Sequence, residues 1–254
     1  ETLALEILKK ERYGKIRLYG SLGFALVALF LSYFVDNHLY ILLFLAIFSL
    51  LFGISAYIIS FSSESREVET LEPNIKAIFT KERGLWLNIL LLQLSFGGFY
   101  SFFTIYETEM GFSIETVSYF WIFGVFCEIV MLYFQGYILA KFDLYKVIRF
   151  ASFATAVRWF LLFLYADNLT MVFVTQAFHA LSFALYHSAV ISYLFSAYEK
   201  KKLAQQFYYG IAYGLGMFLG SLLAGAVYGE CLFLFSSCVA FMAFAALYLK
   251  RTLI

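Results

Sequence analysis

The sequence predicts an all-α, polytopic membrane protein, and three of its features point to this class. Hydrophobic residues make up 63% of the 254 residues and charged residues only 14%, which leaves more apolar surface than a soluble chain of this length can bury. The apolar residues come in runs of about 20, the number that a helix needs to cross the hydrocarbon core of a bilayer. Within these runs Leu, Phe, Ile and Ala lack the strict alternation with polar residues that marks the strands of a membrane barrel.

Eight of these runs are long enough to span a membrane. The first two are close together, a long charged segment follows them, and the other six succeed one another through short connections. The predicted spans are residues 18 to 35, 39 to 61, 85 to 106, 117 to 140, 145 to 165, 169 to 194, 206 to 228 and 231 to 249.

The segment of residues 62 to 84 differs from the other connections because it is long, rich in charge and contains the only proline, Pro73. Proline favours the first turn of a helix, and Ile75, Ile78 and Phe79 would share one side of a helix that begins there. We therefore predict a linker between two domains, with a short amphipathic helix along the membrane surface.

The charges predict how the spans run. Alternating spans bring most of the basic residues to one side: the N-terminal segment, Lys141 with Lys146, residues 200 to 202, and Lys250 with Arg251. The loops of the other side are acidic, with Asp36, Glu107, Glu109, Glu115, Asp167 and Glu230. Basic loops stay in the cytoplasm, so both ends of the chain are expected there.

The net charge is only +1 and the basic residues form no continuous face, which argues against a nucleic-acid partner.

Cofactor and enzyme chemistry have little support in the sequence. Cys231 and Cys238 stand seven apart on one predicted helix, about 10 Å along its axis and too far for a disulfide. No His-Glu-x-x-His or paired-cysteine motif indicates a metal. A rhomboid-type protease needs a Gly-x-Ser-Gly nucleophile, and the Gly-Ser-Leu-Gly of Gly20 to Gly23 does not supply one.

Three ionisable residues lie deep in three consecutive spans. Glu128, Arg158 and His179 are each about 18 to 22 Å of helical rise from the cytoplasmic end, near the midplane. Each alone would cost several kcal/mol in lipid, and pairing Glu128 with Arg158 would remove most of that penalty. Two interpretations are open: a structural salt bridge that fixes the helix packing, or a proton or substrate site of a transporter.

Helical spacing adds further polar residues to this site. Tyr186 is seven residues after His179, so the two would be nearly eclipsed, with Ser182 and Phe183 between them on one stripe. His187 lies about 80° away around the same helix and could face the lower part of a cavity or serve in packing.

Four motifs in order along the chain resemble the major facilitator superfamily, within it the proton-linked group that includes lactose permease and the phenylpropionate permeases. They are Y-G-K-I-R-L-Y-G-S-L-G-F at Tyr13 to Phe24, F-C-E at Phe126 to Glu128, A-V-R-W at Ala156 to Trp159 and Q-A-F-H at Gln176 to His179.

This resemblance implies that the eight spans are helices five to twelve of a twelve-helix fold. Residues 1–61 would be the last two helices of the N-terminal half, 62–84 the cytoplasmic central linker and 85–254 the C-terminal six-helix half. The first four helices would then be missing, so the chain, which starts at Glu1, is expected to be a fragment of a protein that is monomeric when complete. The resemblance to this group also implies that the protein lies in a bacterial cytoplasmic (inner) membrane.

The same resemblance implies proton-coupled symport of a small organic solute by alternating access, with protons as coupling ion and no cofactor. Glu128, Arg158 and His179 would couple the proton. Arg17 and Phe24 match positions that contact sugar in lactose permease, and Gln93 with Tyr100, seven residues apart, would form a cavity stripe. The expected solute-binding residues are thus Arg17, Phe24, Gln93, Tyr100, Ser182, Tyr186 and His187.

The chain also departs from that group. Gln93 and Phe96 stand where lactose permease has acidic residues, Gln176 where it has a lysine, and Ser182 where it has another acidic residue. The details of its proton relay therefore do not transfer directly. A uniporter, an exchanger or a transport-inactive sensor on the same scaffold stays open, as does an intramembrane enzyme.

Overall fold

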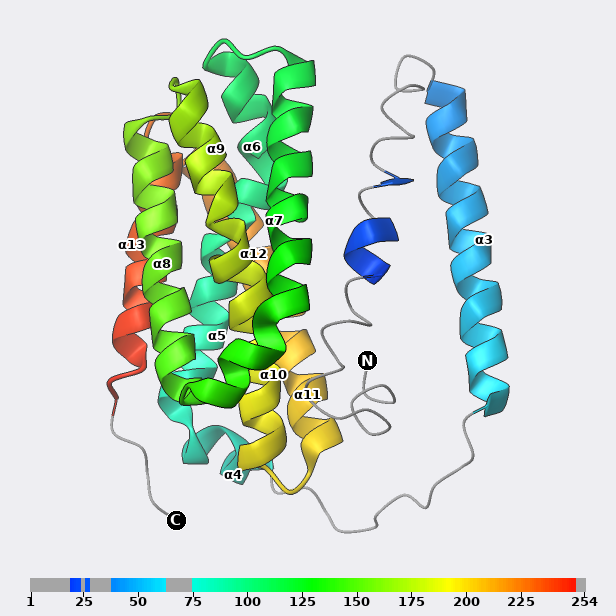
Figure 1. Cartoon of the computed structure of the whole chain (residues 1–254), viewed down its shortest axis with the longest axis vertical. Coiled ribbons are helices and arrows are strands. Elements are labelled where there is room, and N and C mark those ends of the chain that lie inside the picture. The colour runs from blue at the N-terminus through cyan, green and yellow to red at the C-terminus, as the bar shows by residue number, and fades with distance from the viewer. Residues whose placement is uncertain (1–18, 24–25, 28–37, 63–74, 250–254) are drawn as a thin grey trace. The chain divides into compact units, whose positions relative to one another are not determined.

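The computed structural model describes residues 19–23, 26–27, 38–62 and 75–249. All regular secondary structure in these ranges is helical, and none of them contains a strand (Figure 1). Five of the helices are long and apolar enough to cross a membrane. The predicted all-α, polytopic membrane fold is thereby confirmed.

The chain divides into two compact units, of which the smaller comprises Leu22–Asn74. Its long helix α3 (His38–Ser62) has 25 residues and matches the predicted span 39 to 61. Most of the predicted span 18 to 35 lies outside the described residues, which include helical turns at 19–23 and 26–27.

The larger unit holds the six remaining predicted spans, and Ser21 belongs to it as well. Each predicted span corresponds to one helix or to two or three consecutive helical segments. They are α5 (Arg83–Ser95) with α6 (Gly97–Glu109), α7 (Ile114–Lys141), α8 (Leu144–Leu164), α9 (Leu169–Ala177) with η1 (Ala180–Leu185) and α10 (Tyr186–Ala197), α11 (Lys201–Tyr209) with η2 (Gly210–Gly216) and α12 (Met217–Ala226), and α13 (Leu232–Ala246).

Short capped turns join these helices. Ser113 Oγ accepts a hydrogen bond from the backbone of Thr116 at the start of α7, and Asp143 Oδ1 accepts one from Lys146 at the start of α8. Such caps satisfy backbone N–H groups that the first helical turn leaves unpaired. Consecutive spans therefore run antiparallel, and α13 packs against both α5 and α8.

The charged segment before α5 contains the predicted short helix, α4 (Ile75–Lys81). Its apolar side packs on the bundle: Ile78 is buried, and the Phe79 ring lies 5.2 Å from that of Trp86. Trp86 Nε1 and Tyr198 Oη both donate to the carbonyl oxygen of Ile78. Burial raises the pKa of Tyr198 to about 12. The helix thus packs against the bundle within the larger unit. Pro73 lies outside the described residues.

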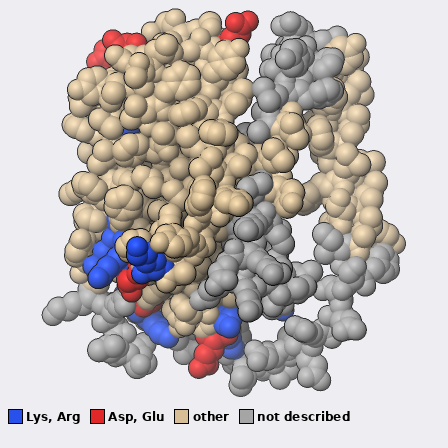
Figure 2. Space-filling model, viewed as in Figure 1, with Lys and Arg blue, Asp and Glu red and all other residues tan. Residues whose placement is uncertain are grey.

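Charged side chains of the larger unit concentrate at its two ends. On the face in Figure 2 most Lys and Arg atoms lie at one end, with some acidic atoms among them, and the opposite end shows acidic atoms. The connections between helices follow the same distribution: Lys141 and Lys146 flank the α7–α8 turn, while Asp167 lies between α8 and α9.

The prediction that Glu107 lies in a loop is wrong. Because α6 continues to Glu109, Glu107 is a fully buried residue of its last turn.

Glycines let α5 and α6 approach the helix formed by η2 and α12. A Cβ on Gly220 would collide with the backbone of Leu94, and one on Gly97 would collide with the backbone of Gly220. Inside a membrane the hydrophobic effect does not drive helices together, so close van der Waals contact at small residues stabilises their packing instead.

We expect Gly220→Ala to lower the free energy of unfolding by about 1 to 3 kcal/mol, the usual cost of overpacking. Gly210→Ala is the matched control, since a Cβ there meets nothing within 4 Å. Thermal unfolding of the full-length protein in detergent measures both. Equal midpoints for the two variants would contradict this packing.

Candidate functional site

The site is centred on Arg158 of α8, whose side chain has no exposed surface. Its Nη1 lies 3.0 Å from His179 Nδ1 and donates to Ser182 Oγ at 3.1 Å. Its Nη2 donates to Gln176 Oε1 at 3.2 Å. All three partners belong to the single span Leu169–Ala197, so this one cation joins α8 to that span at three points.

Aromatic rings provide the remaining surroundings of the guanidinium. Its Cζ lies 4.5 Å from the ring centre of Phe99 and 4.3 Å from that of Trp159. Both rings are buried. Such faces attract a cation, and the attraction is stronger where water is excluded. The described residues give Arg158 no carboxylate as a direct partner, so its charge rests on neutral acceptors and aromatic faces.

His179 stands between Arg158 and Glu128. Its Nε2 lies 3.6 Å from Glu128 Oε2, while Glu128 Oε1 accepts a hydrogen bond from Ser21 Oγ at 2.9 Å. The predicted direct pairing of Glu128 with Arg158 is therefore replaced by a relay of three side chains. The predicted common depth brings the three residues together, but side-chain reach decides which two groups meet.

This geometry fixes the tautomer of His179. A guanidinium only donates hydrogen bonds, so the Nδ1 that faces Arg158 must accept. The ring proton of the neutral imidazole then sits on Nε2, on the side of Glu128. A second proton, on Nδ1, would place a positively charged imidazolium against the positively charged guanidinium of Arg158.

A local change of helix type aligns the partners of Arg158. The span leaves α-helical geometry at Phe178 and continues as the π-helix η1, which His179 precedes and which contains Ser182. π-helical turns are rare and recur at functional sites. Here the turn places two polar side chains against one guanidinium.

Tyr186 lies in a second polar cluster. Its hydroxyl donates to Asn88 Oδ1 at 2.7 Å, and Asn88 Nδ2 donates to Ser152 Oγ and to the Ala243 carbonyl. These contacts join α5, α8, α10 and α13. The structure therefore separates Tyr186 from the stripe with His179, because the π-helical turn between them alters the α-helical spacing.

His187 lies in a third, tyrosine-rich cluster. Its Nδ1 is 3.0 Å from the hydroxyls of both Tyr208 and Tyr213, and the Tyr209 ring is 6.1 Å away. Phe183 stacks on His179 at 5.1 Å and on His187 at 6.4 Å, so aromatic rings connect this cluster to the one around Arg158.

The other expected solute-binding residues have different positions. Gln93 is buried in α5, and its Nε2 has no hydrogen-bond partner in the part of the chain that the structure describes. Tyr100 is 39% exposed in α6 and stacks on Phe96. The turn at Phe96 separates the two helices, so an unbroken stripe from Gln93 to Tyr100 does not form. Arg17 and Phe24 lie outside the described residues.

Comparison with known proteins agrees with this architecture. The model of the MFS_1 like family matches residues 1–238. The chain belongs to this family. The finding confirms the resemblance to the major facilitator superfamily, and family and relatives' names indicate a transporter rather than an enzyme.

Two curated relatives of this MFS_1 like protein come from bacteria. It is 25% identical over 223 residues to the probable 3-phenylpropionic acid transporter of Escherichia coli (strain K12). The matched region is 85% of this chain and 59% of that relative. It is 27% identical over 188 residues to the uncharacterized transporter YwbF of Bacillus subtilis (strain 168), covering 72% of this chain and 46% of the relative. The chain thus spans about half the length of these relatives.

Sequence reasoning missed Asn88, Tyr208 and Tyr213 in this MFS_1 like chain. An asparagine within an apolar span is a signal in itself, since an unpaired amide is costly in lipid. The two tyrosines gave no such signal, because tyrosines are frequent throughout this sequence.

For the MFS_1 like protein we expect Tyr186→Phe to lower the free energy of unfolding by about 1 to 3 kcal/mol, because Asn88 Oδ1 would lose its donor. Solute affinity should stay within about twofold, a free-energy change well below that of one hydrogen bond. Tyr119→Phe, on the exposed side of α7, serves as the control. Thermal unfolding and solute binding of the full-length protein measure these effects. Full stability with lost binding would instead place Tyr186 at the solute.

Proposed function

We propose that the full-length protein is a proton-coupled symporter of a small organic solute, and that the solute carries a carboxylate. The observation that carries this proposal is the relay of Glu128, His179 and Arg158, three ionisable groups buried inside the membrane-spanning bundle. Ionisable residues at such depth mark ion and proton pathways. The carboxylate is suggested by a buried cation without a direct acidic partner among the described residues and by the organic acid in the name of the Escherichia coli relative.

The charge states of the relay account for coupling. With Glu128 ionised, His179 neutral and Arg158 charged, the cluster has no net charge. A proton on Glu128 gives the cluster a net charge of +1, which a bound carboxylate returns to zero. A net charge is costly in a site of low dielectric constant, whereas the two neutral states are tolerated. Proton and carboxylate therefore favour each other's binding, as symport requires.

Access to Arg158 requires a conformational change, because the guanidinium is fully buried. In this proposal the helical bundle rocks between states open to either side, and the π-helices η1 and η2 adjust as it does so. The cavity of such a transporter lies between two halves, so the preceding helices of the same protein would be partners in function. The complete protein would act as a monomer in the bacterial cytoplasmic (inner) membrane.

Glu128→Gln tests the coupling step. The amide keeps the shape of the carboxyl but cannot take up the proton, so uphill, proton-driven uptake should fall to the level of downhill equilibration. Exchange of labelled for unlabelled solute should continue, because it needs no net proton movement. Glu115→Gln at the exposed start of α7 is the control and should accumulate solute normally.

Two related variants sharpen this test. Arg158→Ala should weaken solute binding as well as uptake, while His179→Gln should change the pH profile of uptake and keep the fold. Energised uptake near that of the unsubstituted protein in both Glu128→Gln and Arg158→Ala would refute the relay as coupling site. Uptake that does not depend on a proton gradient would favour a uniporter or an exchanger. Binding of the solute without any uptake would favour a transport-inactive sensor.

The distribution of charge supports a cytoplasmic location for the basic end of the larger unit. In a cysteine-free variant of the full-length protein, Ser113→Cys should react with an impermeant thiol reagent added outside cells. Glu199→Cys at the other end should react only after the membrane is opened. Both positions are exposed, so accessibility does not differ between them. The reverse labelling would overturn the proposed orientation.

A further inference from the structure

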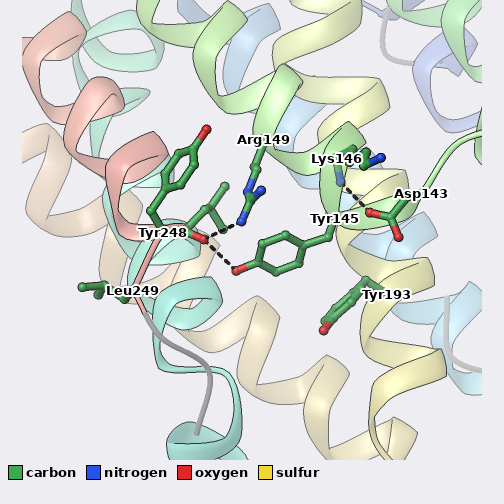
Figure 3. A pocket seen from close by; sticks show the side chains of 8 residues that line it. Asp143, Tyr145, Lys146, Arg149, Tyr193, Tyr248 and Leu249 are labelled. Atoms are coloured by element: carbon green, nitrogen blue, oxygen red, sulfur yellow. Dashed lines mark hydrogen bonds between the residues drawn. The ribbon is translucent and has the colours of Figure 1, made fainter.

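A hollow of about 510 Å³ opens at the basic end of the larger unit, away from the relay. It is formed by the start of α8, by Tyr193 of α10 and by the residues that follow α13 (Figure 3). Both α8 and α13 have an end here, so the hollow lies where membrane spans end. Nothing in the proposed transport mechanism uses it.

Arg149 is held in this hollow by two aromatic rings and a backbone carbonyl. Its Cζ lies 5.0 Å from the ring centre of Tyr145 and 4.5 Å from that of Tyr248. Its Nη2 donates to the carbonyl oxygen of Leu247 at 3.2 Å, and its buried Nε has no hydrogen-bond partner among the described residues. A guanidinium that is already oriented loses little conformational freedom when it binds an anion.

The charge in the hollow is not balanced. Lys146 adds a second cation, and Asp143 is the acidic residue of the lining. Asp143 Oδ1 is occupied by the backbone N–H of Lys146, as the cap of α8 (Figure 3). Neither Lys146 nor Arg149 forms an ion pair with a carboxylate of the described residues. The hollow therefore offers a net positive charge and unused donors.

One side of the rim of the hollow carries large, exposed apolar side chains. Tyr248, whose ring lies beside Arg149, is 61% exposed, and Leu249, which also lines the hollow, is 52% exposed. A positive centre with apolar side chains on its rim, at the end of membrane spans, suits a molecule with an anionic head and acyl chains.

We propose that this hollow binds a phosphate anion, and that the phosphate belongs to the headgroup of an anionic phospholipid. Arg149 would hold two phosphate oxygens with its planar donors, and Lys146 would add a mobile ammonium. The acyl chains would run along Tyr248 and Leu249. Soluble phosphate offers the same anion without these chains, and it should bind more weakly.

The test uses the full-length protein in a neutral detergent and follows its thermal unfolding. The probes are dioctanoyl phosphatidylglycerol, dioctanoyl phosphatidylcholine and sodium phosphate. We expect phosphatidylglycerol to raise the midpoint at the lowest concentration. Phosphatidylcholine has the same chains and a phosphate, but its quaternary ammonium meets two cations and should bind more weakly.

Arg149→Gln combined with Lys146→Gln should weaken phosphatidylglycerol binding about tenfold or more, as expected for the loss of charge-assisted hydrogen bonds. The matched control is Lys141→Gln combined with Lys201→Gln, which removes two exposed cations from the same end of the bundle and should bind normally. Lys146→Gln alone changes an exposed side chain, so it should weaken binding severalfold without affecting folding, even where the double variant is unstable.

Three results would overturn the proposal. Equal losses in the double variant and its control would show only a general effect of charge. Equal binding of the two lipids would exclude selection for an anionic head. Sodium phosphate that binds as tightly as phosphatidylglycerol, and loses affinity in the double variant, would replace the lipid by a soluble phosphate.

Discussion

The burial of Arg158 is the constraint on which the rest of this bundle depends. A guanidinium without exposed surface needs acceptors for its donors and a surrounding that tolerates its charge. Three side chains of one neighbouring span supply acceptors for Nη1 and Nη2, while the buried Nε has no partner among the described residues, and two buried aromatic rings supply the surrounding. Because these groups must all meet one planar cation, α8 and the span Leu169–Ala197 have little freedom to slide or rotate against each other while the contacts persist.

The polar cluster around Asn88 and the relay of Glu128, His179 and Arg158 differ in the kind of group that they contain. Asn88 ties α5 to α8, α10 and α13 through bonds among neutral groups, which no proton or anion alters near neutral pH. The relay consists of ionisable groups, so in the proposed transport cycle an added proton would change the charge next to Arg158. The π-helix η1 lies between these two regions on the same span. A segment with non-standard hydrogen bonding is a reasonable place for a helix to adjust while its next part, α10, stays fixed to the bundle.

Features that depend on length, depth and chemical type could be predicted from the sequence. Runs of about 20 apolar residues located the spans, and helical rise placed Glu128, Arg158 and His179 at one level. Which of the three would touch could not be predicted, since this depends on the rotation of each helix and the reach of each side chain. The prediction also assumed unbroken α-helical periodicity. The turn at Phe96 and the π-helix after His179 both violate that assumption, which is why Gln93 does not share a stripe with Tyr100 and why Tyr186 binds Asn88. Glu107 shows the same dependence on boundaries, because the extension of α6 to Glu109 moved it from a loop into the bundle.

A relay has a physical advantage over the direct ion pair that the sequence suggested. Coulomb energy falls in inverse proportion to distance, so a carboxylate in contact with a buried guanidinium would be held strongly in its charged form. Protonating that carboxylate would break the pair and leave the guanidinium alone. With an imidazole between them, Glu128 is separated from Arg158 by the width of a ring, and the hydrogen bonds of Arg158 go to His179, Ser182 and Gln176 rather than to Glu128. In the proposed transport cycle this arrangement would let the cation keep its place while the charge next to it changes, which separates the packing of the helices from the uptake and release of the proton.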